Sequence, residues 1–169
     1  MLSKNGRFKG RLYRALNPIY ARESLSGRGA ALYGGRFNTK GVEALYTALD
    51  PVTALREAHQ VGDLQPTTLV SYKADLGPVF DTRDAAGLVA FGLVATDLAD
   101  QSWRAAMLDG RPVRTQDFAK ELITRGFAGC LVRSFAPGAI DTNLNMVLWR
   151  WNTPENMLDV IDDEARLQR

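Results

Sequence analysis

The sequence has few of the cysteine and histidine residues on which most metal and thiol sites depend. Its 169 residues include a single cysteine, Cys130, and a single histidine, His59. One cysteine cannot form an internal disulfide, and one histidine and one cysteine cannot make the cluster that holds zinc. The acidic residues also lack the spacing of a calcium loop. We therefore expect no metal cofactor, and we interpret Cys130, which lies in an apolar run, as a buried thiol.

Long hydrophobic runs are also absent. No apolar run approaches the roughly 20 residues that a bilayer-spanning helix needs, and the basic start of the chain lacks the hydrophobic stretch of a signal peptide. The net charge is only +2, although lysines and arginines gather in the first fourteen residues and acids gather near the end. We expect a cytoplasmic protein that binds no membrane. We also expect no direct binding of nucleic acid, because so small a net charge attracts a phosphate backbone weakly.

Segments with the period of strands alternate with segments with the period of helices. Strands are predicted at residues 11–16, 45–48, 68–74, 130–134 and 145–151, with shorter additions at 79–80 and 157–161. Helices are predicted from residue 51 beyond Glu57, at 101–108 and at 115–125, and a polar loop at 24–35 is predicted to cover a ligand. This mixture of helices and mostly antiparallel strands predicts the α+β class. The length and the 46% of hydrophobic residues predict one domain over residues 1–169, with a core at about 12–151.

Two tryptophans stand near the end of the last long predicted strand. Trp149 and Trp151 are two positions apart, so they are predicted to share one face of that strand. We interpret them as a core or partner-binding stripe without a catalytic role.

The most informative stretch reads GGRFNTKGVEALYTALDPVTALRE, from Gly34 to Glu57. Paired glycines allow unusual backbone conformations, so Arg36 can lie at the lip of a cleft with its guanidinium turned inward. The aspartate and proline at 50–51 then open a helix as its N-cap and first helical residue. This strand-to-helix succession brings Tyr46 and Glu57 close to Arg36. A cation, an aromatic face and a carboxylate together suit a nucleotide.

Five short motifs are distributed along most of the chain: LYR at 12–14, GGRFN at 34–38, LYTA at 45–48, ALRE at 54–57 and VRS at 132–134. Together they resemble the RES-domain toxins, a family named for an Arg, a Glu and a Ser. One departure is Phe37, where the family most often has Trp. The resemblance implies a single RES domain with a fold similar to diphtheria-toxin-like ADP-ribosyltransferases, and an activity that consumes NAD.

The resemblance also implies roles for individual residues. Arg14 and Arg36 are assigned to the phosphates and ribose of NAD, and the ring of Tyr46 to stacking on nicotinamide. Glu57 is the candidate catalytic carboxylate, because cleavage of the nicotinamide bond builds positive charge on the ribose that a carboxylate stabilises. Ser134 would either orient Glu57 or bind the ligand by a hydrogen bond. The predicted catalytic residues are thus Glu57, Arg36 and Tyr46, and the predicted NAD-binding residues are Arg14, Arg36, Tyr46 and Ser134.

Each of these residues also has a purely structural interpretation. Glu57 would be a surface acid on a helix, Arg36 a solvated turn residue, Tyr46 a core ring and Ser134 a small residue at a strand end. Arg14 is harder to explain in this way, because a guanidinium inside an apolar strand needs a partner. His59 is expected to be structural or exposed.

Two classes of function remain open. The first is the toxin of a bacterial toxin-antitoxin system, which transfers ADP-ribose from NAD to a cellular protein and releases nicotinamide. With water or phosphate as acceptor, the same chemistry would deplete cellular NAD. For this class the resemblance implies an Xre-like antitoxin that blocks the active site. The second class is a nucleic-acid-binding or RNA-cutting toxin, suggested by a basic arm in which Phe8 and Tyr13 are interleaved, but acid-base cleavage of RNA commonly recruits histidine and this chain has one.

Overall fold

The computed structural model of the protein describes residues 2–3, 5–60 and 63–168. Its centre is a seven-stranded sheet with the strand order β4-β5-β6-β2-β1-β3-β7. The strands are β1 (Phe8–Leu16), β2 (Leu45–Ala48), β3 (Thr68–Leu76), β4 (Val79–Asp81), β5 (Gly129–Arg133), β6 (Leu144–Leu148) and β7 (Met157–Val160). β4 and β5 run parallel, and the other neighbouring strands run antiparallel. This arrangement confirms the predicted α+β class.

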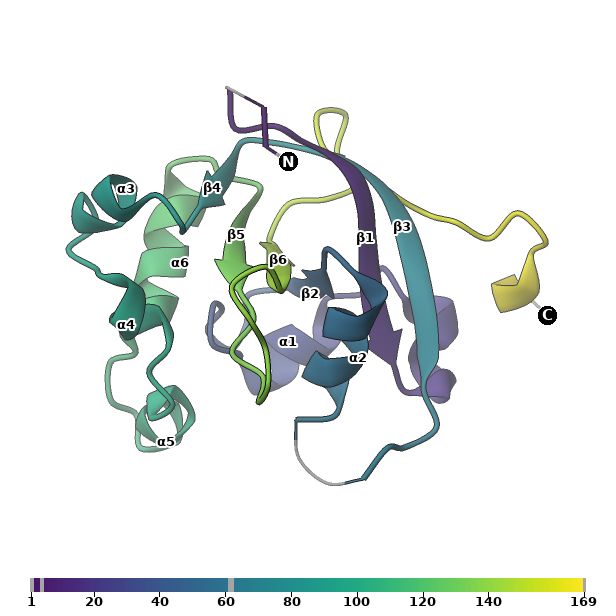
Figure 1. Cartoon of the computed structure of the whole chain (residues 1–169), viewed down its shortest axis with the longest axis horizontal. Coiled ribbons are helices and arrows are strands. Elements are labelled where there is room, and N and C mark those ends of the chain that lie inside the picture. Colours follow the sequence, from purple (N-terminus) through teal and green to yellow (C-terminus); the bar gives the residue numbers. More distant parts are fainter. Residues whose placement is uncertain (1, 4, 61–62, 169) are drawn as a thin grey trace.

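Short helices surround the sheet. They are α1 (Arg28–Tyr33), α2 (Pro51–Ala58), α3 (Ala85–Val89), α4 (Ala95–Leu98), α5 (Trp103–Leu108), α6 (Arg114–Thr124) and the 3-10 helices η1 (Pro18–Glu23) and η2 (Arg166–Gln168). Figure 1 shows α3 to α6 gathered at the end of the sheet that holds β4 and β5, while the long strands β1 and β3 form the other end. In the part of the chain that the structure describes, no helix is long and apolar enough to cross a membrane.

The sheet separates two hydrophobic clusters. Successive residues of a strand point to opposite faces, so Cys130 and Val132 of β5 pack in one cluster whereas Leu131 packs in the other. The first cluster lies under α6, which contributes residues such as Phe118. The second includes Leu12 of β1 and covers the opposite face. Each face of the central strands is therefore buried, which fixes their register.

Most predicted strands form close to their predicted bounds. Residues 79–80 extend the sheet as expected, and β4 does so at the edge beside β5. The interpretation of residues 24–35 as a loop was wrong, because α1 forms within them. No residue of this six-residue helix is buried, so the sequence offers no apolar stripe to reveal it.

The two tryptophans do not share a face. Strand β6 ends at Leu148, so Trp149 and Trp151 lie beyond the regular alternation. Trp149 packs in the cluster under α6 and donates its indole N–H to the carbonyl of Phe37 at 2.9 Å. Trp151 packs against the other cluster and donates to the carbonyl of Leu25 at 3.0 Å. The predicted stripe was therefore wrong, and the two rings serve the cores on opposite faces of the sheet.

Candidate active site

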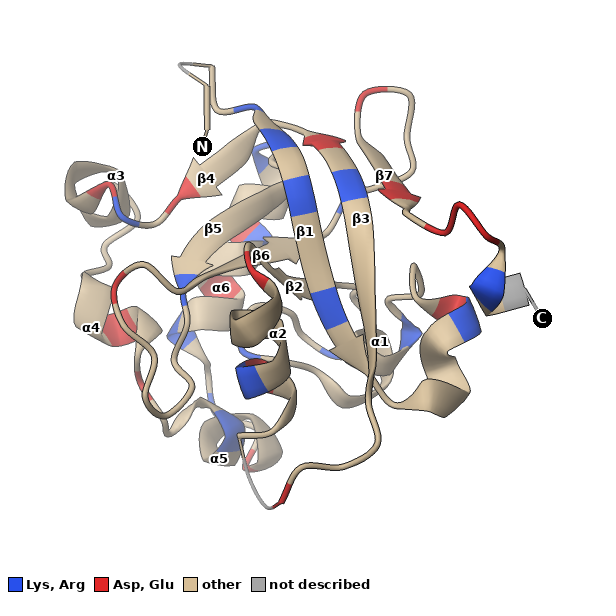
Figure 2. Ribbon diagram, turned by 45° about the vertical axis from the view of Figure 1, so that its right-hand side comes forward, with Lys and Arg blue, Asp and Glu red and all other residues tan. Residues whose placement is uncertain are grey.

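Helix α2 lies in front of the sheet and carries Glu57 in its second turn (Figure 2). Asp50 caps the helix, since its carboxylate accepts a hydrogen bond from the backbone N–H of Thr53 at 2.8 Å, and Pro51 is the first helical residue. This confirms the predicted start. Just after the helix, the ring of His59 lies 2.8 Å from the carbonyl oxygen of Leu55 and 3.0 Å from the hydroxyl of Thr67. The histidine thus ties the end of α2 to the segment before β3, which accords with its expected structural role.

The carboxylate of Glu57 is held by side chains from other parts of the chain. Its Oε1 atom accepts hydrogen bonds from the hydroxyl of Ser134 at 2.5 Å and from the side-chain amide of Asn145 at 2.5 Å. Its Oε2 atom accepts from the side-chain amide of Gln60, which is exposed. Ser134 follows β5 and Asn145 belongs to β6, so two positions on the sheet hold one oxygen of a helical residue.

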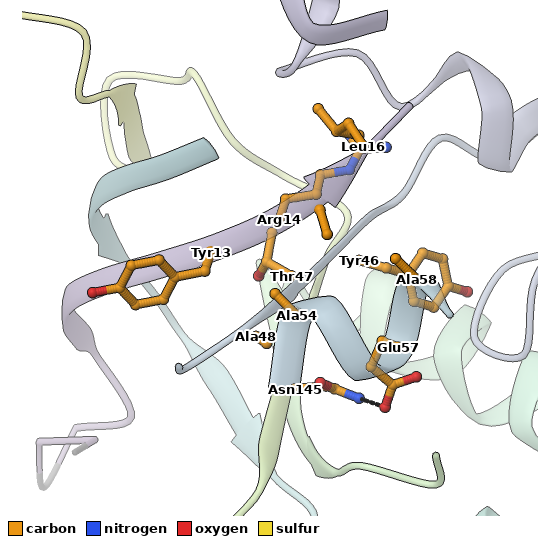
Figure 3. Close-up of a pocket in the computed structure, with 11 residues that line it drawn as sticks. Tyr13, Arg14, Leu16, Tyr46, Thr47, Ala48, Ala54, Glu57, Ala58 and Asn145 are labelled. Carbon is orange, nitrogen blue, oxygen red and sulfur yellow. Dashed lines mark hydrogen bonds between the residues drawn. The ribbon is translucent and has the colours of Figure 1, made fainter. Parts of the chain in front are cut away.

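Two cavities meet at this carboxylate. The smaller, of about 260 Å³, lies between α2 and the strands β1 and β2, and Figure 3 shows the residues that line it. The larger, of about 450 Å³, extends towards α5 and is lined by residues that include Arg36, Trp103, Arg104 and Phe135. Tyr46, Glu57 and Asn145 line both. The site is therefore a cleft with two lobes and a carboxylate between them.

Tyr46 is fixed in the cleft by its hydroxyl group. The hydroxyl donates to the side-chain oxygen of Asn38 at 2.7 Å and accepts from the backbone N–H of Phe37 at 3.0 Å. Burial raises the pKa of the Tyr46 hydroxyl above its ordinary value, so the ring stays neutral at physiological pH. Gly35 lies so close that a Cβ atom there would overlap both the Tyr46 hydroxyl and the Asn38 side chain. The adjacent Gly34 has a φ of +73°, which favours glycine, so the predicted unusual backbone conformation occurs at Gly34, whereas Gly35 is required by the close approach of Tyr46 and Asn38.

Arg36 lines the larger lobe. Its Nη1 atom donates to the carbonyl of Leu98 at 2.8 Å and to the carbonyl of Asp100 at 2.6 Å. Its guanidinium carbon also lies 4.6 Å from the ring centre of Phe135 and 5.7 Å from that of Trp103. Burial lowers the pKa of Arg36, while the nearby Asp100 and Glu57 raise it. Arg36 therefore tethers the connection between α4 and α5 to the cleft while it faces the cavity.

Arg14 lines the smaller lobe, but its guanidinium is occupied elsewhere. Its Nη1 atom donates to the carbonyl of Ser24 at 2.9 Å and to that of Ser26 at 3.3 Å. Burial lowers the pKa of Arg14, and the nearby hydroxyl of Tyr72 opposes that shift. Figure 3 shows the side chain directed away from Glu57. Arg14 has thus found the partners that a guanidinium inside an apolar strand needs, in the segment between η1 and α1.

Cys130 is buried, and burial raises the pKa of its thiol well above the ordinary value, which leaves it neutral and unreactive. Within residues 2–3, 5–60 and 63–168, no group of three or more His, Cys, Asp and Glu side chains could hold a metal ion.

The structure thus brings Glu57, Tyr46 and Arg36 to one cleft, with Arg14 on the wall of its smaller lobe. Ser134 contacts Glu57 but lines neither lobe, so it lies behind the carboxylate. Asn145 was not predicted. The signal for it was weak but present, since asparagine is depleted from strands and this one stands in the apolar run LNMVLW at 144–149.

Comparison with known proteins agrees with this fold. The crystal structure of the M. tuberculosis MbcT-MbcA toxin-antitoxin complex contains a chain that superposes with a TM-score of 0.63 at 20% sequence identity, covering 92% of this chain and 85% of that one. No curated protein matches the sequence significantly. The family model of the RES domain matches residues 11–169. The match spans nearly the whole chain and includes every predicted site residue, and on this basis the protein belongs to the RES domain family.

Proposed function

We propose that this protein is the toxin of a bacterial toxin-antitoxin system and that it cleaves NAD, transferring ADP-ribose to a cellular protein with release of nicotinamide. One observation carries the proposal: the carboxylate of Glu57 lies between two cavities, with one oxygen held by two donors from the sheet. Family membership supports the same activity, because the resemblance to RES-domain toxins implies NAD as the substrate.

Glu57 supplies the electrostatic stabilisation that this reaction needs. Breaking the bond between nicotinamide and ribose expels a neutral ring and leaves an oxocarbenium-like ribose with positive charge. A carboxylate that is already oriented stabilises that charge without reorganising during the reaction, and it also accepts a hydrogen bond from a ribose hydroxyl. In this mechanism the ribose hydroxyl takes the place of Gln60 at Oε2, since the Gln60 side chain is exposed to solvent, which can satisfy its amide once it is displaced.

The other cleft residues bind and orient the substrate. Arg36 offers its remaining N–H groups to the pyrophosphate, because its Nη1 atom is already engaged with two carbonyls. The ring of Tyr46, neutral and fixed by its hydroxyl, presents a flat surface on which nicotinamide stacks. Ser134 orients Glu57 through its hydrogen bond to Oε1. Arg14 acts by holding the wall of the smaller lobe through the carbonyls of the 24–26 segment.

Transfer to water or phosphate is the second candidate. The larger lobe carries Arg104 as well as Arg36, so it has more positive charge than a single pyrophosphate contact requires. Such a lobe would also attract inorganic phosphate as the acceptor, and the protein would then deplete NAD without modifying a macromolecule.

Binding of RNA is less well supported. The basic arm at the start of the chain is partly neutralised, because both Arg7 and Lys9 pair with the carboxylate of Asp75. This pairing lowers the positive charge that the arm offers to a phosphate backbone.

An antitoxin partner completes the proposal. The superposed structure is a complex of a toxin with its antitoxin. We propose that an Xre-like antitoxin binds this protein and obstructs its cleft. Purified complex that releases nicotinamide as fast as the free protein would rule out this mode of inhibition.

The acceptor is identified by incubating the protein with NAD labelled on its adenylate, in the presence of cell lysate. Free nicotinamide and label on macromolecules are measured together, with inorganic phosphate present or absent. Nicotinamide release with labelled protein supports transfer, and release that depends on phosphate without labelling supports phosphorolysis. No release from the wild-type protein under any of these conditions would refute NAD cleavage.

A further inference from the structure

Asn145 occupies an unusual position for an asparagine. It lies in the interior half of the sheet, where its direct neighbours across the strands are Ala48 of β2 and Val132 of β5. Both neighbours are apolar and buried, so Asn145 is a polar side chain in an apolar row beneath α2. Its amide Nδ2 atom reaches up to Oε1 of Glu57 at 2.5 Å (Figure 3).

This placement costs stability. In the part of the chain that the structure describes, Oδ1 of Asn145 is buried without a hydrogen-bond partner. A buried acceptor that loses water and gains no donor is unfavourable. Turning the amide over would not help, because Oδ1 would then face the negative carboxylate of Glu57. A valine at this position would pack against the same neighbours, suit the strand better and leave no unsatisfied atom.

We infer that Asn145 is a positioning residue for Glu57, kept for its amide donor in spite of that cost. A glutamate side chain has three rotatable bonds, and a single donor leaves its carboxylate free to swing. Ser134, which follows β5, and Asn145 on β6 both donate to Oε1, so that Oε2 carries only the exposed side chain of Gln60, which a ligand hydroxyl replaces in the proposed mechanism. A carboxylate stabilises the charge of a transition state most effectively when it is already oriented before the substrate binds. The inference rests on the proposed function, in which Glu57 stabilises the ribose cation.

Two substitutions at this position separate positioning from packing. Asn145→Ala removes the donor, and Asn145→Asp keeps the shape but replaces the donor with a second carboxylate oxygen. We expect Asn145→Ala to lower kcat for nicotinamide release by about tenfold to a hundredfold, the value of a hydrogen bond to a charged group, with KM for NAD within about twofold of wild type. Asn145→Asp is expected to be at least as slow, because the new carboxylate repels Glu57. A packing role predicts the reverse order, with the isosteric aspartate close to wild type and alanine impaired.

Stability provides a second test, with Asn156 as the matched control. Asn156 is buried, whereas Asn145 is partly exposed to the cleft; the side-chain oxygen of Asn156 accepts from the backbone N–H of Gly77 at 2.8 Å, and Asn156 lines neither lobe. Asn156→Ala should lower the melting temperature by a few degrees and leave kcat unchanged, since it strands a backbone donor. Asn145→Ala should do the opposite, lowering kcat with little loss of melting temperature, because it removes an unsatisfied acceptor.

A crystal structure of Asn145→Ala tests the inference independently of activity. We expect the Glu57 carboxylate to occupy more than one rotamer or to leave the Ser134 hydroxyl. A carboxylate unchanged in position, or a kcat equal to wild type, would overturn the positioning role while leaving NAD cleavage intact. A wild-type protein without nicotinamide release would instead refute the proposed function, and the Glu57 rotamer in the variant would still decide whether Asn145 positions it.

Discussion

Ser134 and Glu57 are 77 positions apart in the chain, and the hydroxyl of one donates to the carboxylate of the other at 2.5 Å. The contact joins the end of β5 to the second turn of α2. Ser134 is itself fixed, because its backbone N–H donates to the carbonyl of Asn143 at 2.8 Å. The position of the proposed catalytic carboxylate therefore depends on long-range folding of the sheet.

The first prediction concerns the two donors on this oxygen. Ser134→Ala should lower kcat for nicotinamide release by about tenfold, since one charge-assisted hydrogen bond is lost. In the double variant, Ser134→Ala with Asn145→Ala, the decrease in kcat should differ from the product of the two single decreases, because both residues act on one atom. Steady-state kinetics of the four proteins measures this. If the decrease in kcat of the double variant equalled the product of the two single decreases, Ser134 and Asn145 would not act through the same Glu57 oxygen.

The second prediction concerns the glycine turn. Gly35→Ala should destabilise the protein by about 2 kcal/mol or more, because the added Cβ overlaps the Tyr46 hydroxyl and Asn38. Gly29→Ala is the matched control, since Gly29 lies in α1 and its added Cβ would meet no described atom within 4 Å beyond its chain neighbours and the backbone of its own helix. Alanine there should leave stability unchanged or raise it slightly. Chemical denaturation measures both variants, and equal stabilities would contradict the proposed close approach at Gly35.

The third prediction separates the ring of Tyr46 from its hydroxyl. Tyr46→Phe removes the partner of Asn38 and of the Phe37 N–H, so the free energy of unfolding should fall by about 1–3 kcal/mol. The ring remains, so KM for NAD should rise much less than in Tyr46→Ala. If the two variants had the same KM, stacking by the ring would be excluded.

The fourth prediction concerns the tether formed by Arg36. Arg36→Lys keeps the charge but cannot reproduce a planar guanidinium between two rings and two carbonyls. The free energy of unfolding should fall by about 2 kcal/mol, and KM for NAD should rise. Arg104→Lys serves as the control for stability. Arg104 is exposed, and its guanidinium carbon lies 5.2 Å from the ring centre of Trp103. A fully stable Arg36→Lys protein would argue against a structural role for the tether.

Local features of the fold were predictable, and long-range ones were not. The start of α2 follows from Asp50 and Pro51, which are adjacent and act through their own backbone neighbours. The position of β4 depends on its pairing with β5, some fifty residues later in the chain, and no local pattern encodes that pairing. Helices α3 and α4 span five and four residues, too few to show a helical period.

In the candidate site, too, the residues close together in the sequence were predictable and the one brought in by long-range pairing was not. The turn at Gly34 and Gly35, the ring of Tyr46 and the carboxylate of Glu57 lie within one stretch of sequence, and the structure brings them to one cleft. Asn145 joins them only through the pairing of β6 with β2 and β5. A single asparagine in an apolar strand does not reveal what its amide contacts.

The fifth prediction concerns the buried thiol. Because burial raises the pKa of Cys130, the thiolate is scarce in the folded protein even in mildly alkaline solution. A thiol reagent at about pH 8 should therefore not react with the native protein and should react with one thiol per chain after unfolding in guanidinium. Rapid reaction of the native protein would place Cys130 at the surface.

The most direct test of NAD cleavage by Glu57 is the rate of nicotinamide release from NAD by purified wild-type protein and by Glu57→Gln. The substitution preserves size and removes the negative charge, so the rate should fall by about a hundredfold to a thousandfold while the melting temperature stays close to that of the wild type. Equal rates from the two proteins, or no release from the wild type, would contradict a catalytic role for Glu57.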